Sequence, residues 1–366
     1  MKITCLIASL RLGGAERQLV GLATLLKQSG EDVDVVTYRE GDFYEDELRS
    51  AGIRHTCIDS RGGDFRIVRR LAEHFRQNGS EVVISFLVGA NIKACMAHIV
   101  YPGFKLVVSE RNCNTSLLLH DIFRFTLYRM EADSVVCNSF AQTSFLIRHC
   151  PGLRLRLETI PNFVDFEKFA SIEDRRPSDG PLRVVTVARL SPRKNATGLI
   201  RAAADPSLKG VRFDWYGSGS NKSYEKRCHR LIERLNIGDR FTIHPASNDP
   251  AAIYAASDAF CLCSWYEGTP NSLAEALSSG LPAVCSEVSD NARYVIPGRN
   301  GFLFTPRDSR SIAKALRKLT ALSPGELEEA RKNSRLIAAE NFPKDLFTKR
   351  YIDLLRGLAG GQAGSQ

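Results

Sequence analysis

The chain has 366 residues, of which 43% are hydrophobic and 25% charged, so it is not a small disulfide-stabilised scaffold and should form about two globular domains. Its net charge of +9 is uneven, because residues 1–170 carry 21 basic and 20 acidic residues whereas the remainder carries 29 and 21. We therefore expect an anionic ligand in the second half, and the lack of a long basic run interleaved with aromatic residues favours a phosphorylated small molecule over a nucleic acid.

The first half alternates strand-like and helix-like segments. The opening segment KITCLIAS predicts a buried strand, and the glycine turn LRLGGAE leads from it into a helix that stops at Gly30. Further β-branched runs, separated by helix-length segments, lie at 33–38, 55–58, 82–86, 105–110 and 134–138. This pattern predicts a doubly wound α/β domain over residues 1–165. Because no run has the properties of a signal peptide or the roughly 20 apolar residues of a membrane span, we expect a cytoplasmic location.

The second half repeats this organisation after a linker. Residues 160–181 are rich in Pro, Asp and charged residues and have no sustained period, which is typical of a linker. Apolar runs then follow at 183–190, 211–217, 240–245, 258–265 and 281–286. We expect a second doubly wound domain over 178–340, a C-terminal helix over 341–356 that returns to the first domain, and a flexible tail over 357–366.

The cysteines do not indicate a metal centre. The ten cysteines have neither CxxC spacing nor a histidine pattern for zinc, so we expect reduced thiols, no metal site and no cofactor. Cys261 and Cys263 lie two residues apart on a predicted strand and should face the core together. The motif Asp32-Val33-Asp34 enters a strand instead of leaving one, and we interpret it as structural.

Candidate ligand-binding loops follow predicted strands, because ligands of open parallel sheets collect at the carboxyl ends of the strands. Gly13 and Gly14 precede a helix whose free amides could approach an anion, although an ordinary strand-to-helix turn would need the same glycines. Glu110, Arg111 and Asn112 follow another buried strand. They are expected to face the cleft, with a salt-bridged loop as the alternative.

The segment WYEGTPNSLAEALSSGLP is the most informative one. Thr269 suits a helix N-cap, Pro270 suits the first helical position and Gly280 suits the helix end. The backbone amides of residues 270–273, except for Pro270, which has no N–H, are therefore expected to point at the ligand and to bind a diphosphate.

Charged residues lie on both sides of this helix start. Arg189 and Lys194 follow the first strand of the second half, so both cations can converge on one crevice, with ordinary exposed residues as the alternative. Glu267 lies just before the helix and Glu275 lies two turns along it. One carboxylate is then near the mouth of the site and the other deeper along the same ligand, unless Glu275 is a solvated helix residue.

Taken together, these loops resemble the retaining glycosyltransferases of family 4, which have the GT-B architecture of two Rossmann-like domains facing a central cleft. The resemblance covers nearly the whole chain and rests on GGAE at 13–16, IPNFVDFEKF at 160–169, ARLSPRKN at 188–195, YGSGS at 216–220 and EGTPNSLAEALSSGLP at 267–282. At 109–112, SERN stands where some relatives have a catalytic-domain histidine. In this the chain resembles bacterial members that add N-acetylhexosamines to polyprenyl-diphosphate-linked sugars.

The resemblance implies an activity. A hexose or N-acetylhexosamine would move, with retention, from a nucleoside diphosphate sugar such as UDP-GalNAc or UDP-GlcNAc to a hydroxyl of a polyprenyl-diphosphate-linked glycan. No metal ion is expected, because two cations and a helix N-terminus can stabilise the departing diphosphate.

The resemblance also assigns roles to residues. It implies that Arg189 and Lys194 contact the diphosphate, that Glu267 positions the donor sugar and that Glu275 binds the ribose. The expected catalytic residues are Glu267, Arg189 and Lys194. The expected donor-binding residues are Gly13, Gly14, Gly217, Gly268, Thr269, Asn271, Ser272, Leu273 and Glu275. The expected acceptor or cleft residues are Glu16, Glu110, Arg111, Asn112 and His120.

A lipid-linked acceptor would bring the first domain to the cytoplasmic face of the inner membrane. Residues 61–76 combine five arginines with apolar residues and could form an interfacial helix, with a helix packed on its own sheet as the alternative. Residues 121–130 have the same two interpretations.

Two other functions stay open. A nucleotide-sugar 2-epimerase has the same architecture, but the sequence contains no obvious acid/base pair for it. A nucleotide-binding module without turnover is the second, and the presence of Glu267, Arg189 and Lys194 argues against it. A dehydrogenase is disfavoured because GxGxxG is missing.

Overall fold

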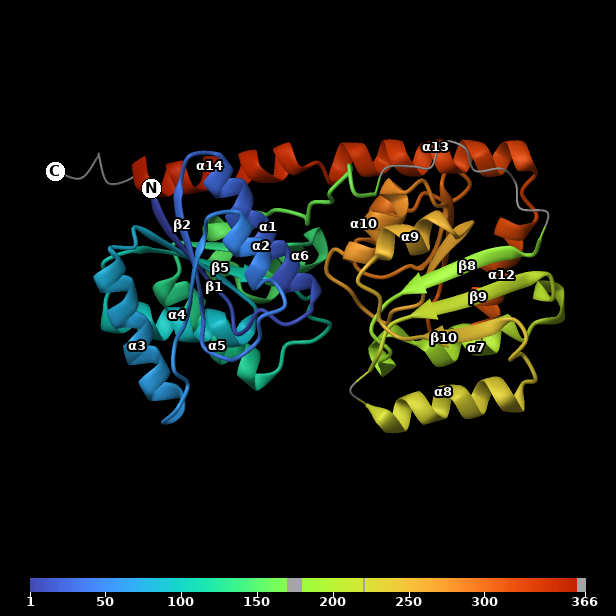
Figure 1. The fold of residues 1–366 in the computed structure, drawn as a ribbon, viewed down its shortest axis with the longest axis horizontal. Coiled ribbons are helices and arrows are strands. Elements are labelled where there is room, and N and C mark those ends of the chain that lie inside the picture. Colours follow the sequence, from blue (N-terminus) through green and yellow to red (C-terminus); the bar gives the residue numbers. More distant parts are fainter. Residues whose placement is uncertain (170–179, 220, 361–366) are drawn as a thin grey trace. The chain divides into compact units, whose positions relative to one another are not determined.

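The computed structural model describes residues 1–169, 180–219 and 221–360 (Figure 1). Its contacts divide into two units, one formed by Met1–Asn162 with helix α14 (Lys344–Gly360) and the other by Phe163–Pro343. Part of the predicted linker, and the start of the second domain expected at residue 178, lie outside the described residues.

The first unit is built on a parallel sheet. Within the described part of the unit, seven strands pair in the order β3-β2-β1-β4-β5-β6-β7. The strands are β1 (Lys2–Leu6), β2 (Asp32–Thr37), β3 (Arg54–Cys57), β4 (Val82–Phe86), β5 (Lys105–Glu110), β6 (Ser134–Cys137) and β7 (Leu157–Thr159). Every residue of β4 is buried, which explains why its sequence VVISF is β-branched and apolar without alternation.

Helices connect these strands and cover the sheet. They are α1 (Gly14–Gln28), α2 (Glu45–Ser50), α3 (Gly63–Asn78), α4 (Val88–Val100), α5 (Leu119–Glu131), α6 (Phe140–His149) and the 3₁₀ helix η1 (Pro151–Arg156). Apolar side chains of α3, α4, α5, α6 and η1 share one core with the strands. Helix α1 contacts α14. The chain from residue 357, predicted as a tail, is still helical to Gly360, while 361–366 lie outside the described residues.

The second unit has the same kind of sheet. In its described residues six parallel strands pair in the order β10-β9-β8-β11-β12-β13. The strands are β8 (Leu182–Val187), β9 (Val211–Tyr216), β10 (Phe241–His244), β11 (Ala259–Leu262), β12 (Ala283–Ser286) and β13 (Gly301–Phe304). The predicted doubly wound α/β architecture is therefore confirmed for both halves.

Two layers of helices enclose the second sheet. They are η2 (Pro192–Lys194), α7 (Ala196–Ala203), η3 (Pro206–Leu208), α8 (Lys222–Arg234), α9 (Pro250–Ala255), α10 (Asn271–Ser278), α11 (Asn291–Tyr294), α12 (Ser309–Thr320) and α13 (Pro324–Asn341). Helices α7, α8 and α12 share one core with the strands, and α9, α10 and α13 share another (Figure 1). Cys261 and Cys263 are both fully buried in the first of these cores, as predicted.

The strand order determines where a ligand can bind in each unit. It reverses between β1 and β4 in the first unit and between β8 and β11 in the second. Neighbouring strands at such a point send their crossovers in opposite directions, which leaves a crevice outside their carboxyl ends. In the second unit, the loops that leave β8 and β11 carry Lys194 and Glu267, so the topology brings these two residues to the same crevice.

The arginine-rich helix α3 packs on its own sheet. Its apolar residues Ile67, Val68, Leu71 and Phe75 are at most 5% exposed and belong to the core of the first unit. Phe65 is the exception, with 68% of its surface exposed. Of the two expectations for this helix, packing on its own sheet is therefore confirmed for the apolar face of α3.

Candidate functional site

An ion pair between side chains and a hydrogen bond between backbone groups join the loops after β8 and β11. Lys194 Nζ forms an ion pair with Glu267 Oε1, and the two side chains are only 12% and 5% exposed. One residue before Lys194 and two before Glu267, the amide of Trp265 donates to the carbonyl of Arg193 at 2.9 Å. The two loops therefore hold a nearly buried charge pair at the point where the strand order reverses.

Glu267 is fixed from several directions. Its backbone amide donates to Ser289 Oγ at 3.1 Å, in addition to the ion pair that its carboxylate forms with Lys194. Ser289 has a φ of 50°, a left-handed conformation that non-glycine residues rarely adopt and that often accompanies functional sites. Burial disfavours the charged carboxylate, but the positive charges of Lys194 and Arg193 outweigh burial and lower the pKa of Glu267.

The helix after Glu267 begins one residue later than predicted. Pro270 is the N-cap of α10, with an extended backbone, and Thr269 is a buried residue before it. The amides of Leu273 and Ala274 already donate to the Pro270 carbonyl, so the amides that precede the first helical bonds are those of Asn271 and Ser272. The helix ends at Ser278 and Gly280 follows with a φ of 73°, as the sequence predicts for its stop.

Glu275 is buried, and the interpretation as a solvated helix residue is wrong. It is 3% exposed, and the hydroxyl of Tyr254, on α9, donates to its Oε2 at 3.1 Å. The same hydroxyl lies 3.2 Å from the carbonyl of Ser272 in the first turn of α10. Tyr254 thus fixes both the start of α10 and the carboxylate that the helix carries.

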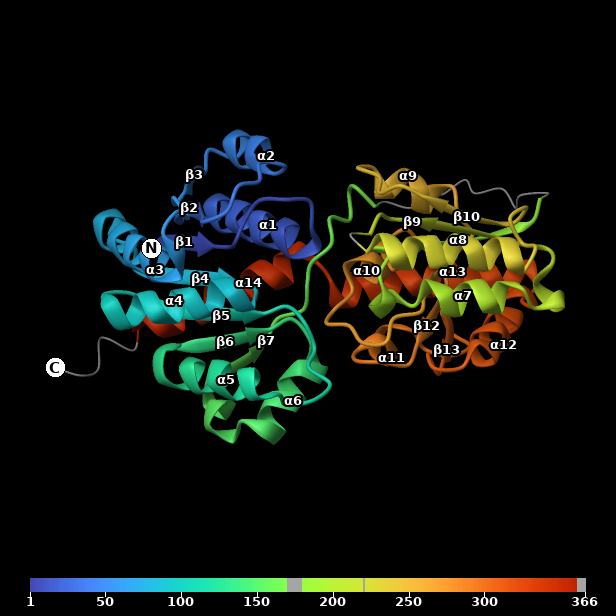
Figure 2. The same cartoon turned by 90° about the horizontal axis from the view of Figure 1, so that it is seen from below.

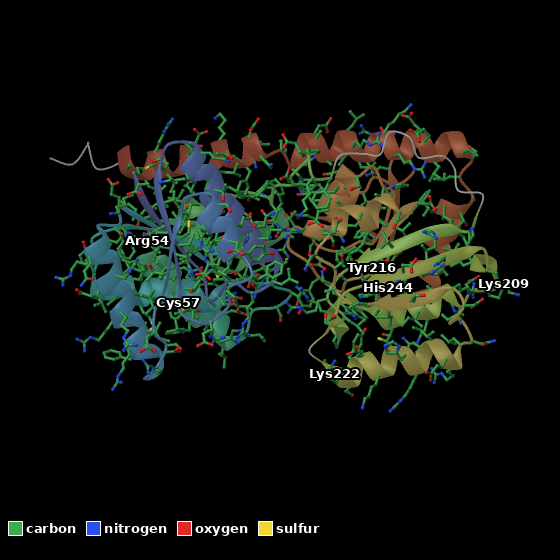
Figure 3. The ribbon with its side chains drawn as sticks, in the orientation of Figure 1. Arg54, Cys57, Lys209, Tyr216, Lys222 and His244 are labelled. Atoms are coloured by element: carbon green, nitrogen blue, oxygen red, sulfur yellow. The ribbon has the colours of Figure 1, made fainter. Side chains whose placement is uncertain are left out.

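Gly217 lets the turn after β9 lie directly on the loop after β8. Its φ is 149°, and a Cβ atom at this position would lie 2.0 Å from the carbonyl oxygen of Ala188. The neighbouring ring of Tyr216 stacks on that of His244 at a centroid distance of 4.3 Å, and His244 Nε2 lies 2.7 Å from Asp214 Oδ1 (Figure 3). The expected donor-binding role of Gly217 thus coincides with a packing requirement.

The remaining predicted residues of the second unit lie near this pair. Arg189 follows β8 and is exposed, and outside residues 170–179, 220 and 361–366 the structure describes no ion pair for it. Gly268 is buried next to Glu267, and Leu273 is buried in the α10 core. The pair that the structure brings into contact is thus Lys194 and Glu267, with Glu275 on the following helix.

Gly13, Gly14 and Glu16 form the start of α1 in the first unit. Gly13 is the N-cap, and the carboxylate of Glu16 folds back over it, since a Cβ atom on Gly13 would lie 2.1 Å from Glu16 Oε2. The hydroxyl of Tyr44 donates to the Gly13 carbonyl at 3.3 Å.

Glu110 belongs to a buried polar network. The hydroxyl of Tyr128 donates to Glu110 Oε1 at 2.8 Å, and Arg124 Nη1 lies 3.4 Å from Glu110 Oε2. Arg124 also pairs with Asp121 at 2.8 Å and donates to Asn114 Oδ1 at 3.1 Å. Burial outweighs the charge of Arg124 and raises the pKa of Glu110. Glu110 was expected to face the cleft, with a salt bridge as the alternative. The structure shows the salt bridge.

The other candidates of the first unit differ in exposure. Arg111 is 8% exposed, donates to Asn162 Oδ1 at 2.6 Å and lies over the ring of Phe86. Asn112 is exposed. The side chain of His120 is 72% exposed, with Nε2 3.5 Å from Asp121 Oδ1.

The described residues contain no cluster of three or more His, Cys, Asp or Glu that could hold a metal ion. The motif Asp32-Val33-Asp34 lies at the start of β2, as expected, and Asp34 accepts hydrogen bonds from Thr4 and Asn78 at 2.6 and 3.0 Å. Across the described part of the chain, no helix has the length and hydropathy needed to cross a membrane.

Sequence reasoning missed two residues of this site. Ser289 contacts Glu267 from the loop after β12, and Tyr254 contacts Glu275 from α9. Neither has a local signal in the sequence, because only the tertiary structure brings them to the site.

Comparison with known proteins identifies both halves. Residues 12–168 match the family model "Glycosyltransferase Family 4", and residues 167–336 match "Glycosyl transferases group 1". The GalNAc-alpha-(1->4)-GalNAc-alpha-(1->3)-diNAcBac-PP-undecaprenol alpha-1,4-N-acetyl-D-galactosaminyltransferase of Campylobacter jejuni is 27% identical over 86% of this chain and 88% of its own length.

Two further relatives agree with this result over nearly the whole chain. The N-acetylgalactosamine-N,N'-diacetylbacillosaminyl-diphospho-undecaprenol 4-alpha-N-acetylgalactosaminyltransferase of the same organism is 26% identical over 97% of this chain and 100% of its own length. The solved structure of Anabaena Alr3699/HepE in complex with UDP-glucose has a TM-score of 0.86 and 21% identity, covering 98% of this chain and 100% of that one, and supports the GT-B fold. The chain therefore belongs to the glycosyltransferases, as a GT-B protein that joins a Glycosyltransferase Family 4 domain to a Glycosyl transferases group 1 domain.

Proposed function

We propose that this glycosyltransferase moves an N-acetylhexosamine, from UDP-GalNAc or UDP-GlcNAc, to a sugar hydroxyl of a polyprenyl-diphosphate-linked glycan, with retention at the anomeric carbon. The observation that carries the proposal is the Lys194–Glu267 ion pair at the strand-order reversal of the second unit, directly before α10. The names of two relatives, both N-acetylgalactosaminyltransferases whose names include diphospho- or PP-undecaprenol, support the donor and acceptor.

Lys194 would exchange partners when the donor binds. Without a ligand, its charge is balanced by Glu267, and the pair is nearly buried. A donor diphosphate offers Lys194 a second anion, while the exposed Arg189 and the amides of Asn271 and Ser272 supply further positive charge. Together these groups would stabilise the negative charge that develops on the leaving diphosphate, so the proposal needs no divalent ion.

The bond changes of the reaction balance within the bound substrates. The bond between the anomeric carbon and the β-phosphate oxygen breaks, and the acceptor oxygen bonds to the anomeric carbon on the same face. The departing phosphate takes the proton of the acceptor hydroxyl. Glu267, held by Lys194 and Ser289, would position the donor sugar, and Glu275 would accept hydrogen bonds from the ribose hydroxyls.

Epimerisation and nucleotide binding without turnover are the two alternatives. The matched relatives are named as transferases and not as epimerases, which favours transfer. A lipid-linked acceptor would also place the protein on the cytoplasmic face of the inner membrane as a peripheral protein.

The first experiment measures thermal stabilisation by UDP, GDP, ADP and dTDP, each with and without magnesium. A ligand that binds the folded form must raise its stability, so we expect UDP to stabilise the protein by the same amount in both conditions. Incubation with UDP-GalNAc or UDP-GlcNAc and a lipid-linked acceptor analogue is then expected to yield an extended α-linked product. Stabilisation by none of the nucleotides would contradict the proposal, and epimerised donor without an extended acceptor would favour the epimerase.

Glu275→Gln is expected to weaken UDP binding by about 10- to 100-fold, because a hydrogen bond to a charged group contributes about 1.5–3 kcal/mol. The saturated transfer rate should change little, since the ribose lies away from the reacting carbon. Isothermal titration with UDP measures the affinity. Tyr254→Phe serves as the matched control, because it removes the hydrogen bond to Glu275 but keeps the carboxylate. An unchanged affinity in Glu275→Gln would exclude a ribose contact.

A further inference from the structure

The first unit exposes a wide apolar area around α5, α6 and η1. The large apolar side chains in it that are exposed belong to Leu118, Leu119, Ile122, Phe123, Met130, Ile147 and Leu155. We call this set the α5–η1 surface. Leu155 is 100% exposed, Leu119 87%, Met130 64% and Phe123 62%. A surface of this kind on a water-soluble domain generally marks an interaction site.

These side chains lie on adjoining elements. The 3₁₀ helix η1 contacts both α5 and α6 (Figure 2). Arg156, at the end of η1, donates to the carbonyls of Arg129 and Ala132 at 2.8 and 2.7 Å, and this fixes η1 against the end of α5. The elements that carry the apolar residues therefore form one fixed framework.

The core does not need these side chains. Helix α5 already supplies Phe125, Leu127 and Tyr128 to the core of the first unit, and its buried polar residues Asp121 and Arg124 pair with each other. An amphipathic helix normally presents polar residues on its opposite face. In α5 the exposed face instead carries Leu119, Ile122, Phe123 and Met130. An exposed apolar face of this kind indicates a binding partner outside the core.

The charges beside the surface are positive. Arg129, Arg148 and Arg154 are exposed, and the whole segment 112–157 is described. Its three acidic residues are all engaged: Asp121 pairs with Arg124 at 2.8 Å, Glu131 with His98 at 2.9 Å and Asp133 with Lys105 at 3.0 Å. Residues 112–157 thus combine an apolar surface with unneutralised cations, and the first acidic residue beyond them in the chain is the exposed Glu158 on β7.

We propose that the α5–η1 surface binds the surface of an anionic lipid bilayer. Apolar side chains enter the boundary between headgroups and acyl chains, and arginines beside them attract anionic headgroups. The exposed arginines of residues 112–157 complement the negative charge of such headgroups. The proposal deepens the proposed function, on which its biological role rests, because a lipid-linked acceptor is reached only at a membrane.

The experiment is sedimentation of the full chain with phosphatidylcholine vesicles, with and without phosphatidylglycerol. We expect strong binding only when phosphatidylglycerol is present, and weaker binding at high salt. Leu119→Ser with Phe123→Ser should reduce binding by about tenfold or more, because two exposed apolar side chains are lost. Replacement of Arg129, Arg148 and Arg154 by Gln should abolish the preference for phosphatidylglycerol.

Helix α3 provides the matched controls. Phe65→Ser removes an exposed phenylalanine from the same unit, and Arg66→Gln with Arg69→Gln removes exposed arginines, so both should leave binding unchanged. Loss of binding in Phe65→Ser, or wild-type binding in Leu119→Ser with Phe123→Ser, would overturn the proposal. Self-association of the wild type without vesicle binding, measured by analytical ultracentrifugation, would instead identify a second copy as the partner.

The stabilisation by UDP is measured on the same variants. It should be unchanged in all of them, because the substitutions lie in the first unit and the proposed donor site lies in the second. Vesicle binding without any response to UDP would contradict the proposed function and leave the α5–η1 surface supported. A response to UDP without vesicle binding by the wild type would contradict the proposed role of the α5–η1 surface and leave the proposed function supported.

Discussion

Lys194→Ala is expected to lower the rate of glycosyl transfer by about 10²- to 10³-fold, as the loss of one group that stabilises transition-state charge typically does. Lys194 is the cation that the structure holds at the strand-order reversal, next to the start of α10. If it neutralises the leaving diphosphate, its loss affects the rate more than UDP affinity. Single-turnover kinetics with saturating donor measure this rate, and UDP titration measures the affinity.

The pH dependence of stability provides a second measurement for the same variant. The folded-state pKa of Glu267 is lowered, so the ion pair contributes stability above the unfolded pKa of about 4.3 and loses it as the pH falls through the folded value. Lys194→Ala leaves Glu267 buried without its closest cation. We therefore expect Lys194→Ala to be less stable than the wild type at neutral pH, and the difference to shrink in acid.

Two controls separate catalysis from folding. Lys209→Ala removes an exposed lysine at the opposite end of the second unit from Tyr216 and His244 (Figure 3) and should retain the wild-type rate. Lys194→Ala with Glu267→Gln removes both charges and should recover stability without recovering the rate. Transfer by Lys194→Ala at close to the wild-type rate would remove Lys194 from the catalytic residues.

The parts of this site that lie in one loop could be predicted from the sequence. Strand-like runs such as VVISF and KLVVSE predict β4 and β5 with their observed limits, because such strands are buried on both faces and their composition shows it. Lys194 and Glu267 follow two such runs. Parallel strands place their carboxyl ends at one edge, so both residues could be expected at the same crevice, although the ion pair between them could not.

The sequence could not predict which polar residues are buried. Glu110 has partners on α5 and Glu275 has one on α9, and these are 14 to 21 residues away along the chain. Periodicity reports whether a segment has an apolar face, but not which distant polar group meets a carboxylate. Local rules also failed at Thr269, because the extended backbone of Pro270 places the cap one residue further along.

Arg124→Leu is expected to destabilise the first unit by about 3–5 kcal/mol, because it removes the cation from a buried network and leaves carboxylates without compensation. The side chains of Arg124 and Glu110 are 5% and 1% exposed, and Asp121 is 3% exposed. Arg124 also holds Asn114, in the loop after β5. Denaturant unfolding followed by circular dichroism measures the change, and an effect below about 1 kcal/mol would show that solvent replaces the arginine.

Glu110→Gln tests the same network through its pH dependence. Since burial raises the folded-state pKa of Glu110 above the unfolded value, the folded protein binds the proton more tightly. The stability that the protonated carboxyl contributes is therefore fully present below about pH 4.3, the unfolded pKa, and is lost as the pH rises through the folded pKa. Gln cannot ionise, so the stability of the wild type relative to Glu110→Gln should fall as the pH rises. A difference that grows with pH would mean that Arg124 outweighs burial and that Glu110 is held as a carboxylate.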